Sequence, residues 1–436
     1  MSENKKKVTK KKKAVKKNIT VTPATVEDST ITAEEEGKMW ADDKLNEAAS
    51  KELKKKRTIR IAVIAVCAVA VLVLLLVGVG YALISHYYGL TKYVEDDDVS
   101  TMDIEEASAL FSEDGDSYYR MVEETDEDGN VIGTAYETVN LDDLSDEERE
   151  SIEASIAADL AEAEAAQSSA AEEIPIKSSG DVYNLLLVGV DLRAGSNWNG
   201  NSDTMILVSI NSAKKTIYMT SFMRDLYANI PGVGAYKLNR AYALGGGPLL
   251  IQTLEDNYRI SIDNYAWVDF YDMIDIIDLI GGLDIDISSD EVRVANNYIA
   301  EMASGVGLDA NSYYISGSGT LHLNGMQTVA YARIRYVGNA DFGRTQRQRD
   351  VLTKMFEKLK GMSLTEVNTF LNSALPYVTH NIPSDTVTNL ILNVASYLNY
   401  DLVSQRVPFD GYYTYSGEML VPDFEYTINM LQSTIY

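Results

Sequence analysis

Five arginines lie close together between Tyr331 and Asp350, in the stretch YARIRYVGNADFGRTQRQRD. The chain has a formal net charge of -27, and only thirteen of its arginines follow residue 60, so chance scatter explains this concentration poorly. Arginine has a planar fork of donors that binds phosphate oxygens in pairs and keeps its charge when partly buried. The cluster therefore indicates an anionic ligand.

The carboxyl-terminal part of this stretch is expected to be helical. Arg344 and Arg347 are three residues apart and Gln348 is four residues from Arg344, so these three side chains share one helix face. Arg349 points elsewhere and is expected at the surface. Arg333 falls near the end of the preceding helix.

The acidic character of the chain excludes one usual partner of a basic cluster. Nucleic acid binding needs a broad positive surface, which this chain lacks. Arg335, whose geometry the sequence leaves open, completes a local cluster that fits a compact ligand with two or three phosphate charges. If the cluster lies outside a bacterial membrane, the obvious ligand of this kind is a lipid-linked sugar diphosphate.

Two aspartates flank an eleven-residue loop in the stretch VGVDLRAGSNWNGNSDTMIL. Asp191 ends one apolar strand and Asp203 begins the next, so antiparallel pairing of the strands would place both carboxylates at one edge. Two carboxylates with room for water and phosphate oxygens suit Mg²⁺, which prefers oxygen ligands. The alternative is loop capping, in which Asp203 accepts hydrogen bonds from amides of its own turn.

Arg224 and Asp225 directly follow another strand, and loops held by a rigid sheet often carry functional groups. The glycine run at 245–247 precedes a helix and could offer backbone amides to an anion, although glycine also simply begins helices. The chain has only three histidines, and none has a supporting motif, which makes Ser-His-Asp hydrolysis improbable.

From residue 181 onward, short apolar strands alternate with segments of helical periodicity. This alternation predicts an α/β fold, a central sheet covered by helices. The expected strands are 183–191, 204–211, 216–222, 265–270 and 402–408. The expected helices are 247–258, 271–280, 325–335, 345–359, 364–373, 384–398 and one from residue 423.

The chain before this domain divides into three parts by charge and hydropathy. Residues 1–60 form a basic leader, expected to be cytoplasmic and disordered, with 17 Lys and Arg against 10 Asp and Glu. Residues 61–85 contain no charged side chain and are long enough to cross a bilayer as a transmembrane helix, with a cleaved signal peptide as the alternative. The positive flank precedes this segment, so the N-terminus is expected inside and the rest outside. Residues 86–180 are acidic and predict an extracellular low-complexity stalk.

Seven motifs follow one another as in the LytR-CpsA-Psr family, which the chain resembles over residues 181–435. They are NLLLVGVDLR, SDTMIL, SFMRD, KLNRAYALGGG, IGGLDIDI, LHLNGMQTVAYARIRY and DFGRTQRQR. The resemblance implies a catalytic domain over 181–436, with an extracellular α-β-α fold and a mixed central sheet. It also implies a membrane-anchored, Gram-positive envelope enzyme.

The implied reaction moves a glycopolymer, such as teichoic acid or capsular polysaccharide, from undecaprenyl diphosphate to the C6 hydroxyl of N-acetylmuramic acid in peptidoglycan. The enzyme could also have a lipid pyrophosphatase side activity. The alternative is a non-catalytic regulator or scaffold of envelope assembly that binds the lipid diphosphate. By resemblance, Asp191 and Asp203 bind Mg²⁺, with Mn²⁺ as a substitute. The implied catalytic residues are Arg224, Asp225, Arg333 and Arg335. The implied diphosphate-binding residues are Arg193, Arg344, Arg347 and Gln348.

Two positions depart from the family pattern. Asn201 replaces a basic residue that many members have, and Met223 replaces a proline. Asp225 is either a base or a residue that orients Arg224. The polyprenyl chain needs an apolar tunnel, which Ile274, Ile277 and Leu279 would either line or pack beneath as core.

Overall fold

The computed structural model describes residues 85–102, 117–125, 131–140, 144–191, 200–335, 337 and 340–436. The leader and the predicted membrane segment lie outside this part of the chain, apart from Ser85. Within the described ranges, no helix is long and apolar enough to cross a membrane. The anchor and its orientation therefore stay predictions.

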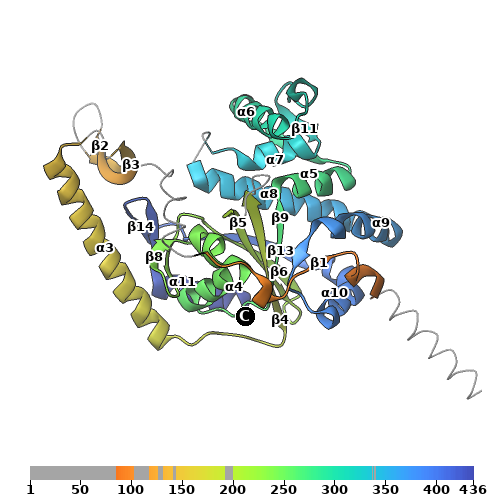
Figure 1. The fold of residues 1–436 in the computed structure, drawn as a ribbon, viewed down its shortest axis with the longest axis horizontal. Coiled ribbons are helices and arrows are strands. Elements are labelled where there is room, and N and C mark those ends of the chain that lie inside the picture. The colour runs from red at the N-terminus through yellow and green to blue at the C-terminus, as the bar shows by residue number, and fades with distance from the viewer. Residues whose placement is uncertain are drawn as a thin grey trace, which may run out of the picture. The chain divides into compact units, whose positions relative to one another are not determined.

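Seven strands form a mixed sheet (Figure 1). In order across the sheet they are β1 (Lys92–Tyr93), β12 (Thr379–His380), β9 (Asn264–Asp269), β4 (Val182–Asp191), β5 (Asn201–Asn211), β6 (Thr216–Phe222) and β13 (Asp401–Val407). β5 pairs antiparallel with β4 and β6, whereas β9 is parallel to β4 and β13 is parallel to β6. β6 is buried along its whole length, as expected for a strand covered on both faces.

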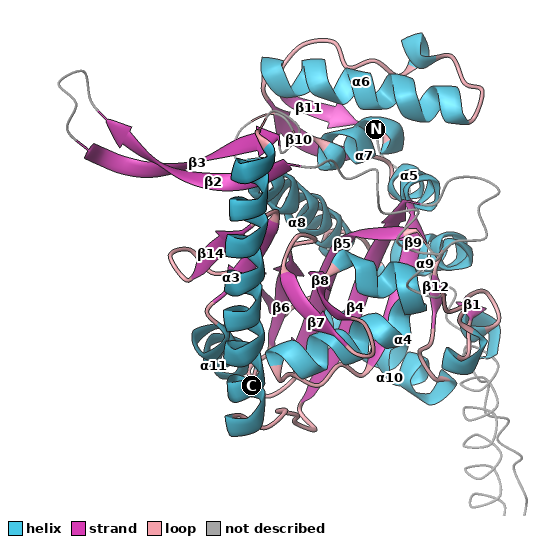
Figure 2. Cartoon of the chain, turned by 60° about the vertical axis from the view of Figure 1, so that its left-hand side comes forward, coloured by secondary structure: helices cyan, strands magenta, loops and turns pink. Residues whose placement is uncertain are grey.

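Helices cover both faces of this sheet (Figure 2). The described α-helices are α3 (Asp146–Glu173), α4 (Asn239–Tyr258), α5 (Phe270–Leu279), α6 (Ser289–Gly305), α7 (Gly325–Arg333), α8 (Ala340–Lys360), α9 (Leu364–Ala374), α10 (Ser384–Tyr397) and α11 (Phe424–Ile435). On one face, Leu186 and Leu207 of the sheet pack in one core with Leu254 of α4 and Leu431 of α11. α5, α7 and α8 lie over the other face. The predicted α/β fold with a mixed central sheet is confirmed.

A second core supports the helices on the α8 face. It joins α5, α6 and α7 to the hairpin of β10 (Leu283–Ile287) and β11 (Gly319–Leu323). Asn324 accepts a hydrogen bond from the backbone of Gln327, and the Gln327 side chain bonds back to Asn324, so this capping box begins α7. The helix begins at Gly325 after this cap, and Arg333 is its last residue.

Three further antiparallel hairpins complete the described strands. They are β2 (Ser117–Thr125) with β3 (Val131–Asn140), β7 (Tyr227–Ile230) with β8 (Gly234–Lys237), and β14 (Tyr413–Ser416) with β15 (Met419–Pro422).

The glycine run at 245–247 lies inside α4, where it makes a kink. Gly245 and Gly246 have non-helical backbone angles, and a Cβ on Gly247 would lie 2.4 Å from the ring of Tyr265. All three glycines are buried. They serve close packing of helix on strand, so the structure does not support an anion site there.

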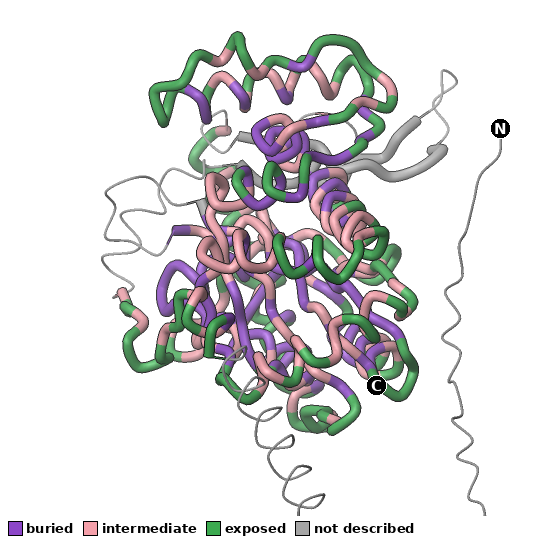
Figure 3. The backbone as a smooth tube through the Cα atoms, turned by 90° about the vertical axis from the view of Figure 1, so that its right-hand side faces the viewer, coloured by how far each residue is buried: buried purple, intermediate pink, exposed green. Residues whose placement is uncertain are grey.

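The predicted stalk of residues 86–180 is corrected by the structure where it is described. β1 pairs with β12 and extends the main sheet. Buried residues, purple in Figure 3, gather in the interior of the described domain, and exposed ones lie on its outer turns. On α3, Ala163, Gln167 and Ala170 are buried on one face, and both alanines pack in a core with Phe424 and Tyr227. Alanine is only weakly apolar and glutamine is polar, so this buried face has little hydrophobic contrast with the rest of the helix. For this reason the sequence suggested an exposed helix.

The packing of α3 can be tested by a charge on its buried face. Ala163→Glu is expected to lower the free energy of unfolding by about 1–3 kcal/mol, because the carboxylate would lie in an apolar contact. Ala161→Glu, on the exposed face of the same helix, is the matched control and is expected to stay within about 0.5 kcal/mol of the wild type. Equal denaturation midpoints for the two variants would support the stalk after all.

Candidate functional site

A β-bulge in β5 directs Asp203 toward the site. In the β4–β5 ladder, Gly189 pairs with Thr204 and Val190 pairs with Ser202, so Asp203 is the extra residue between them. Ser202 donates to the backbone oxygen of Asn239 in α4, whereas Asp203 and Thr204 line cavities on the opposite face of the sheet. The bulge therefore places two consecutive side chains on the α8 side of the sheet.

Asp191 and Arg193 are the two predicted site residues that the structure does not place at side-chain level. The backbone of Asp191 ends β4 and pairs with Asn201, two residues from Asp203. β4 and β5 are thus antiparallel neighbours, as expected, and both aspartates belong to the same edge of the sheet. Arg193 lies outside the described residues.

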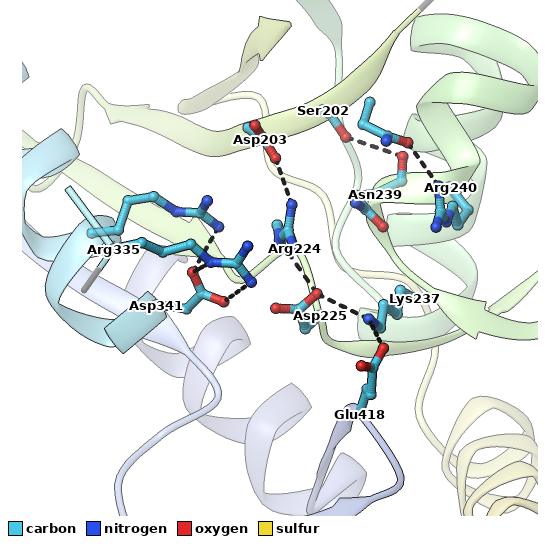
Figure 4. A network of polar contacts seen from close by, with 12 residues as sticks. Ser202, Asp203, Arg224, Asp225, Lys237, Asn239, Arg240, Arg335, Asp341 and Glu418 are labelled. Carbon is cyan, nitrogen blue, oxygen red and sulfur yellow. Dashed lines mark hydrogen bonds and ion pairs between the residues drawn. The ribbon is translucent and has the colours of Figure 1, made fainter. Parts of the chain in front are cut away.

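Arg224 follows β6 and joins two carboxylates (Figure 4). Its Nη1 donates to Asp203 Oδ1 at 3.0 Å, and its Nε lies 3.4 Å from Asp225 Oδ1. Burial acts to raise the pKa of Asp203, but the positive charges of Arg344 and Arg224 outweigh it and lower this pKa below its ordinary value. Asp203 is therefore ionised at neutral pH.

Asp341 holds two arginines from the other side of the site. It begins the motif DFGRTQRQR but was not selected as a site residue from the sequence. Arg335 donates through Nε and Nη2 to both carboxylate oxygens, at 2.9 and 3.1 Å. Arg344 Nη2 lies 2.9 Å from Asp341 Oδ1. Burial acts to raise the pKa of Asp341. The positive charge of Arg344, a side-chain hydrogen bond with Asp225, and the charge and hydrogen bonds of Arg335 together outweigh burial and lower this pKa well below its usual range. The available signal was the three-residue spacing of Asp341 and Arg344 on one helix.

Asp225 contacts Arg224 but does not line the polar cavity that Arg224 and Asp203 line. Lys237 Nζ lies 3.7 Å from its Oδ1 and 2.5 Å from Glu418 Oε2. Burial raises the pKa of Asp225, and the hydrogen bond with Asp341 adds to this effect. These contacts place Asp225 as a residue that orients Arg224, which was one of the two expected roles.

Arg333 enters the site between two aromatic rings. Its guanidinium carbon lies 4.6 Å from the ring centre of Phe270 and 4.9 Å from that of Tyr298, and Nη2 donates to Glu301 at 3.1 Å. Cation–π contacts of this kind fix the orientation of a guanidinium over the ring faces and leave its other N–H donors available to a ligand. Gln348 of α8 lies on the same cavity wall.

The structure places Arg347 away from the cavity, although it was expected to bind diphosphate. Its Nε donates to Glu291 at 2.8 Å, Nη1 to the backbone oxygen of Ile334 at 3.1 Å, and Nη2 to that of Val337 at 2.9 Å. These bonds occupy the guanidinium, so Arg347 holds the segment between α7 and α8. Residues three apart lie only about 60° apart around a helix, so periodicity does not separate Arg347 from Arg344. Their partners do, since Asp341 holds Arg344 whereas Glu291 and two backbone oxygens hold Arg347.

Two adjoining cavities result from these placements. The polar one, of about 140 Å³, is lined by Asp203, Arg224, Phe270, Tyr298, Arg333, Arg335, Arg344 and Gln348. The apolar one, of about 230 Å³, lies between the sheet and helices α5, α7 and α8. Phe270, Arg333 and Gln348 line both. Four arginines and one aspartate in the polar wall make it positive within an acidic chain.

Ile274, Ile277 and Leu279 were expected either to line an apolar tunnel or to pack beneath it as core, and the structure places them differently. Ile277 lines the apolar cavity and also belongs to the second core. Ile274 is buried in that core without lining the cavity, and Leu279 is 43% exposed. Larger parts of the wall come from the sheet, where Leu187, Ile206 and Ala266 were not selected from the sequence.

The two departures from the family pattern each have a local partner. Asn201 accepts a hydrogen bond from Nη1 of the buried Arg240 at 3.2 Å. The backbone N–H of Met223 donates to the oxygen of Val407 at 3.1 Å, a bond that proline would lack. This bond ties the loop of Arg224 to the neighbouring strand β13.

Fold and site together define an α/β protein whose site joins an arginine-lined cavity to an apolar one. The model of the LytR_cpsA_psr family matches residues 150–431, which is more than half of the chain. The chain therefore belongs to the LytR_cpsA_psr family. The match begins within α3, in agreement with the packing of that helix on the domain.

Several known proteins are similar to this chain. Biofilm regulatory protein A of Streptococcus mutans is 30% identical over 246 residues, which cover 52% of this chain and 58% of that protein. The polyisoprenyl-teichoic acid–peptidoglycan teichoic acid transferase TagU of Oceanobacillus iheyensis is 34% identical over 227 residues, 50% of this chain and 65% of that protein. The chain thus matches less than two thirds of either relative.

A solved structure is also similar. Protein gbs0355 of Streptococcus agalactiae is 27% identical, with a TM-score of 0.48, and the match covers 61% of this chain and 88% of that protein.

The role of Asp341 predicts a pH dependence of stability. Its folded pKa is lowered, so its contribution is complete above the ordinary value of about 3.9 and is lost as pH falls through the folded pKa. Asp341→Asn is expected to cost on the order of 3 kcal/mol at pH 7 and to flatten the loss of stability between about pH 5 and 2. Denaturant titrations at several pH values measure both effects.

Asp350→Asn, on the same helix, is the matched control, because its carboxylate accepts only a bond from the exposed Gln346 among the hydrogen bonds described. It should leave the pH profile near that of the wild type. A profile of Asp341→Asn that ran parallel to the wild type would contradict the assigned role of Asp341.

Proposed function

We propose that the chain transfers a glycopolymer from a polyprenyl diphosphate carrier to an acceptor hydroxyl of peptidoglycan. The observation that carries this proposal is the junction of the arginine-lined cavity with the apolar cavity through Arg333, Phe270 and Gln348. A diphosphate attached to a polyprenyl chain has one doubly charged part and one apolar part. The arginine-lined cavity suits the diphosphate and the adjoining apolar cavity suits the start of the polyprenyl chain.

Family membership and the similarity to the teichoic acid transferase TagU support the same reaction class. In our proposal, the carrier is undecaprenyl diphosphate and the acceptor is the C6 hydroxyl of N-acetylmuramic acid. The polymer is teichoic acid or another wall or capsular polysaccharide. The proposed location is the cell membrane, with the N-terminus inside and the described domain outside.

The proposed reaction moves charge toward the arginines. The acceptor oxygen forms a bond to the phosphorus that carries the polymer, and the bond from this phosphorus to the oxygen of the lipid phosphate breaks. The hydroxyl proton leaves to solvent, and the lipid phosphate leaves with the negative charge. Arg224, Arg335 and Arg344 stabilise this charge from positions that carboxylates already fix, so little reorganisation is needed during the reaction. Water in place of the acceptor would give the pyrophosphatase side reaction.

A divalent cation is part of this proposal. Asp203 and Asp191 would hold Mg²⁺, or Mn²⁺ in its place, because their strands end at one edge and carboxylate oxygens are suitable ligands. Within the described residues, no group of three or more acidic, cysteine or histidine ligands gathers at one point, so water and phosphate oxygens would complete the coordination. The cation would supply positive charge to the phosphate oxygens.

Replacement of one cavity arginine tests catalysis directly. Arg335→Ala is expected to lower kcat by on the order of 10²–10³-fold, measured as release of polyprenyl phosphate from a lipid-linked glycopolymer with peptidoglycan as acceptor. Asp203→Asn and treatment with EDTA are expected to lower turnover in the same assay. Arg293→Ala, an exposed arginine of α6, is the control with unchanged turnover. Unchanged turnover in Arg335→Ala and Asp203→Asn would contradict the site assignment.

The apolar cavity can be tested without touching the arginines. Ala332 of α7 lines it, and Ala332→Phe would fill part of the space. Turnover of a long polyprenyl substrate is expected to fall on the order of tenfold, whereas a short-chain analogue should react almost as with the wild type. Ala166→Phe, on the exposed face of α3, controls for the added ring. An equal loss with both substrates would exclude the proposed tail site.

A second candidate function is a non-catalytic regulator or scaffold that binds the lipid diphosphate. The similarity to biofilm regulatory protein A of Streptococcus mutans favours it. Both candidates would bind the lipid diphosphate, and Arg335→Ala would weaken this binding in both. They differ in transfer, because the regulator would transfer no polymer with Mg²⁺ present.

A further inference from the structure

Arg349 lies on the side of α8 that faces the sheet, contrary to the expectation of a surface residue. It is only 3% exposed. Phe342 and Thr345, seven and four residues earlier, and Leu352, three residues later, occupy the same stripe of the helix. Phe342 packs against the first core, Thr345 is buried, and Leu352 lines the apolar cavity. A cation therefore sits in the middle of a stripe that is otherwise buried against the sheet.

A second arginine meets this stripe from the edge strand. Arg406 of β13 pairs with Ser221 of β6, and Ser221 pairs with Ile206 of β5. Paired residues point to the same face of a sheet, and Ile206 lines the apolar cavity on the α8 face. Arg406 and Ser221 therefore face α8 as well. The guanidinium carbon of Arg406 lies 4.5 Å from the ring centre of Phe342.

Several buried donors at this point have no hydrogen-bond partner. They are Nε and Nη1 of Arg349, Nε of Arg406 and Oγ of Ser221. The described acceptors are few: Gln346 Oε1 accepts from Arg349 Nη2 at 2.5 Å, and Asp410 pairs with Arg406 Nη2. Asp410 is 84% exposed, so water screens its charge strongly. No carboxylate within the described residues forms an ion pair with Arg349.

The charge at this point is unbalanced. Burial lowers the pKa of Arg349 to about 10, the charge of Arg406 adds to this lowering, and Asp350 opposes it only in part. Unpaired buried donors and unpaired buried charges are each costly to a folded protein. Water would satisfy the donors but would leave two positive charges side by side, whereas an anion with several oxygens would satisfy both.

We infer that Arg349, Arg406 and Ser221 form a second anion site, which binds a phosphate group between α8 and the edge strand β13. Two guanidinium groups offer planar pairs of donors, and a hydroxyl offers one more, a set that matches the oxygens of phosphate. The site is separate from the polar cavity, because none of its three residues lines that cavity. It does not depend on the proposed transferase reaction. Inorganic phosphate and a phosphodiester of a polymer share this chemistry.

Calorimetry and thermal unfolding with inorganic phosphate test the site. The full-length chain in detergent is titrated at constant ionic strength. The wild type is expected to bind one phosphate more than Arg349→Met, and its unfolding temperature should rise more with phosphate. Without phosphate, Arg349→Met should be the more stable protein, because a buried unpaired charge is replaced by an apolar chain of similar length.

Two further variants keep the test decisive. Arg406→Met is expected to lose the same phosphate, and it carries the test alone if Arg349→Met does not fold. Arg344→Gln, which changes the polar cavity, should retain the response that depends on Arg349. Equal phosphate stoichiometry in the wild type, Arg349→Met and Arg406→Met would overturn the inference. Competition by dimethyl phosphate would assign the site to phosphodiesters, and failure to compete would assign it to free phosphate.

Discussion

The carboxylate of Asp341 accepts two hydrogen bonds from Arg335 and lies 2.9 Å from Arg344, and both arginines line the polar cavity. Guanidinium groups this close repel one another, and burial removes the water that would screen them. Asp341 offsets both costs on one side of the cavity, and Asp203 does so for Arg224 on the other. The positive cavity is therefore assembled before any ligand enters. A phosphate that binds there meets donors already held in place.

The sheet sets the position of one of these carboxylates, Asp203, whereas Asp341 lies on α8. β5 contributes one residue more than β4 to their ladder, and this extra residue is Asp203. Because of the bulge, Asp203 and Thr204 both lie on the α8 side, where one lines the polar cavity and the other lines the apolar one. One backbone irregularity thus brings the charged and apolar parts of the site together. Arg344 and Gln348 of α8 line the polar cavity together with Asp203, whereas Arg349 lies on another face of this helix.

Much of the fold could be predicted from the sequence because it rests on local patterns. Apolar runs bounded by turns marked the central strands, and helical periodicity marked α5, α7, α8 and α11. The packing of α3 was missed because alanine and glutamine give a weak pattern, and the edge strand β1 was missed because two residues carry almost no signal. Both elements are held by contacts with segments more than 80 residues away.

The sequence by itself determined which residue types the site would use, since arginines gathered in an acidic chain indicate an anionic ligand and aspartates at strand ends suit a cation. It also determined that Arg344 and Gln348 share a helix face, because helical periodicity is local. Only the tertiary structure decided which arginines reach the cavity. Arg344, Arg347 and Arg349 lie within six residues, yet they line the polar cavity, hold the loop between α7 and α8, and face the edge strand, respectively. The physical reason is that a buried charge takes its role from the partners that surround it. Asp341 lies on the same helix as Arg344, three residues away, whereas Glu291 and Arg406 reach Arg347 and Arg349 only through packing.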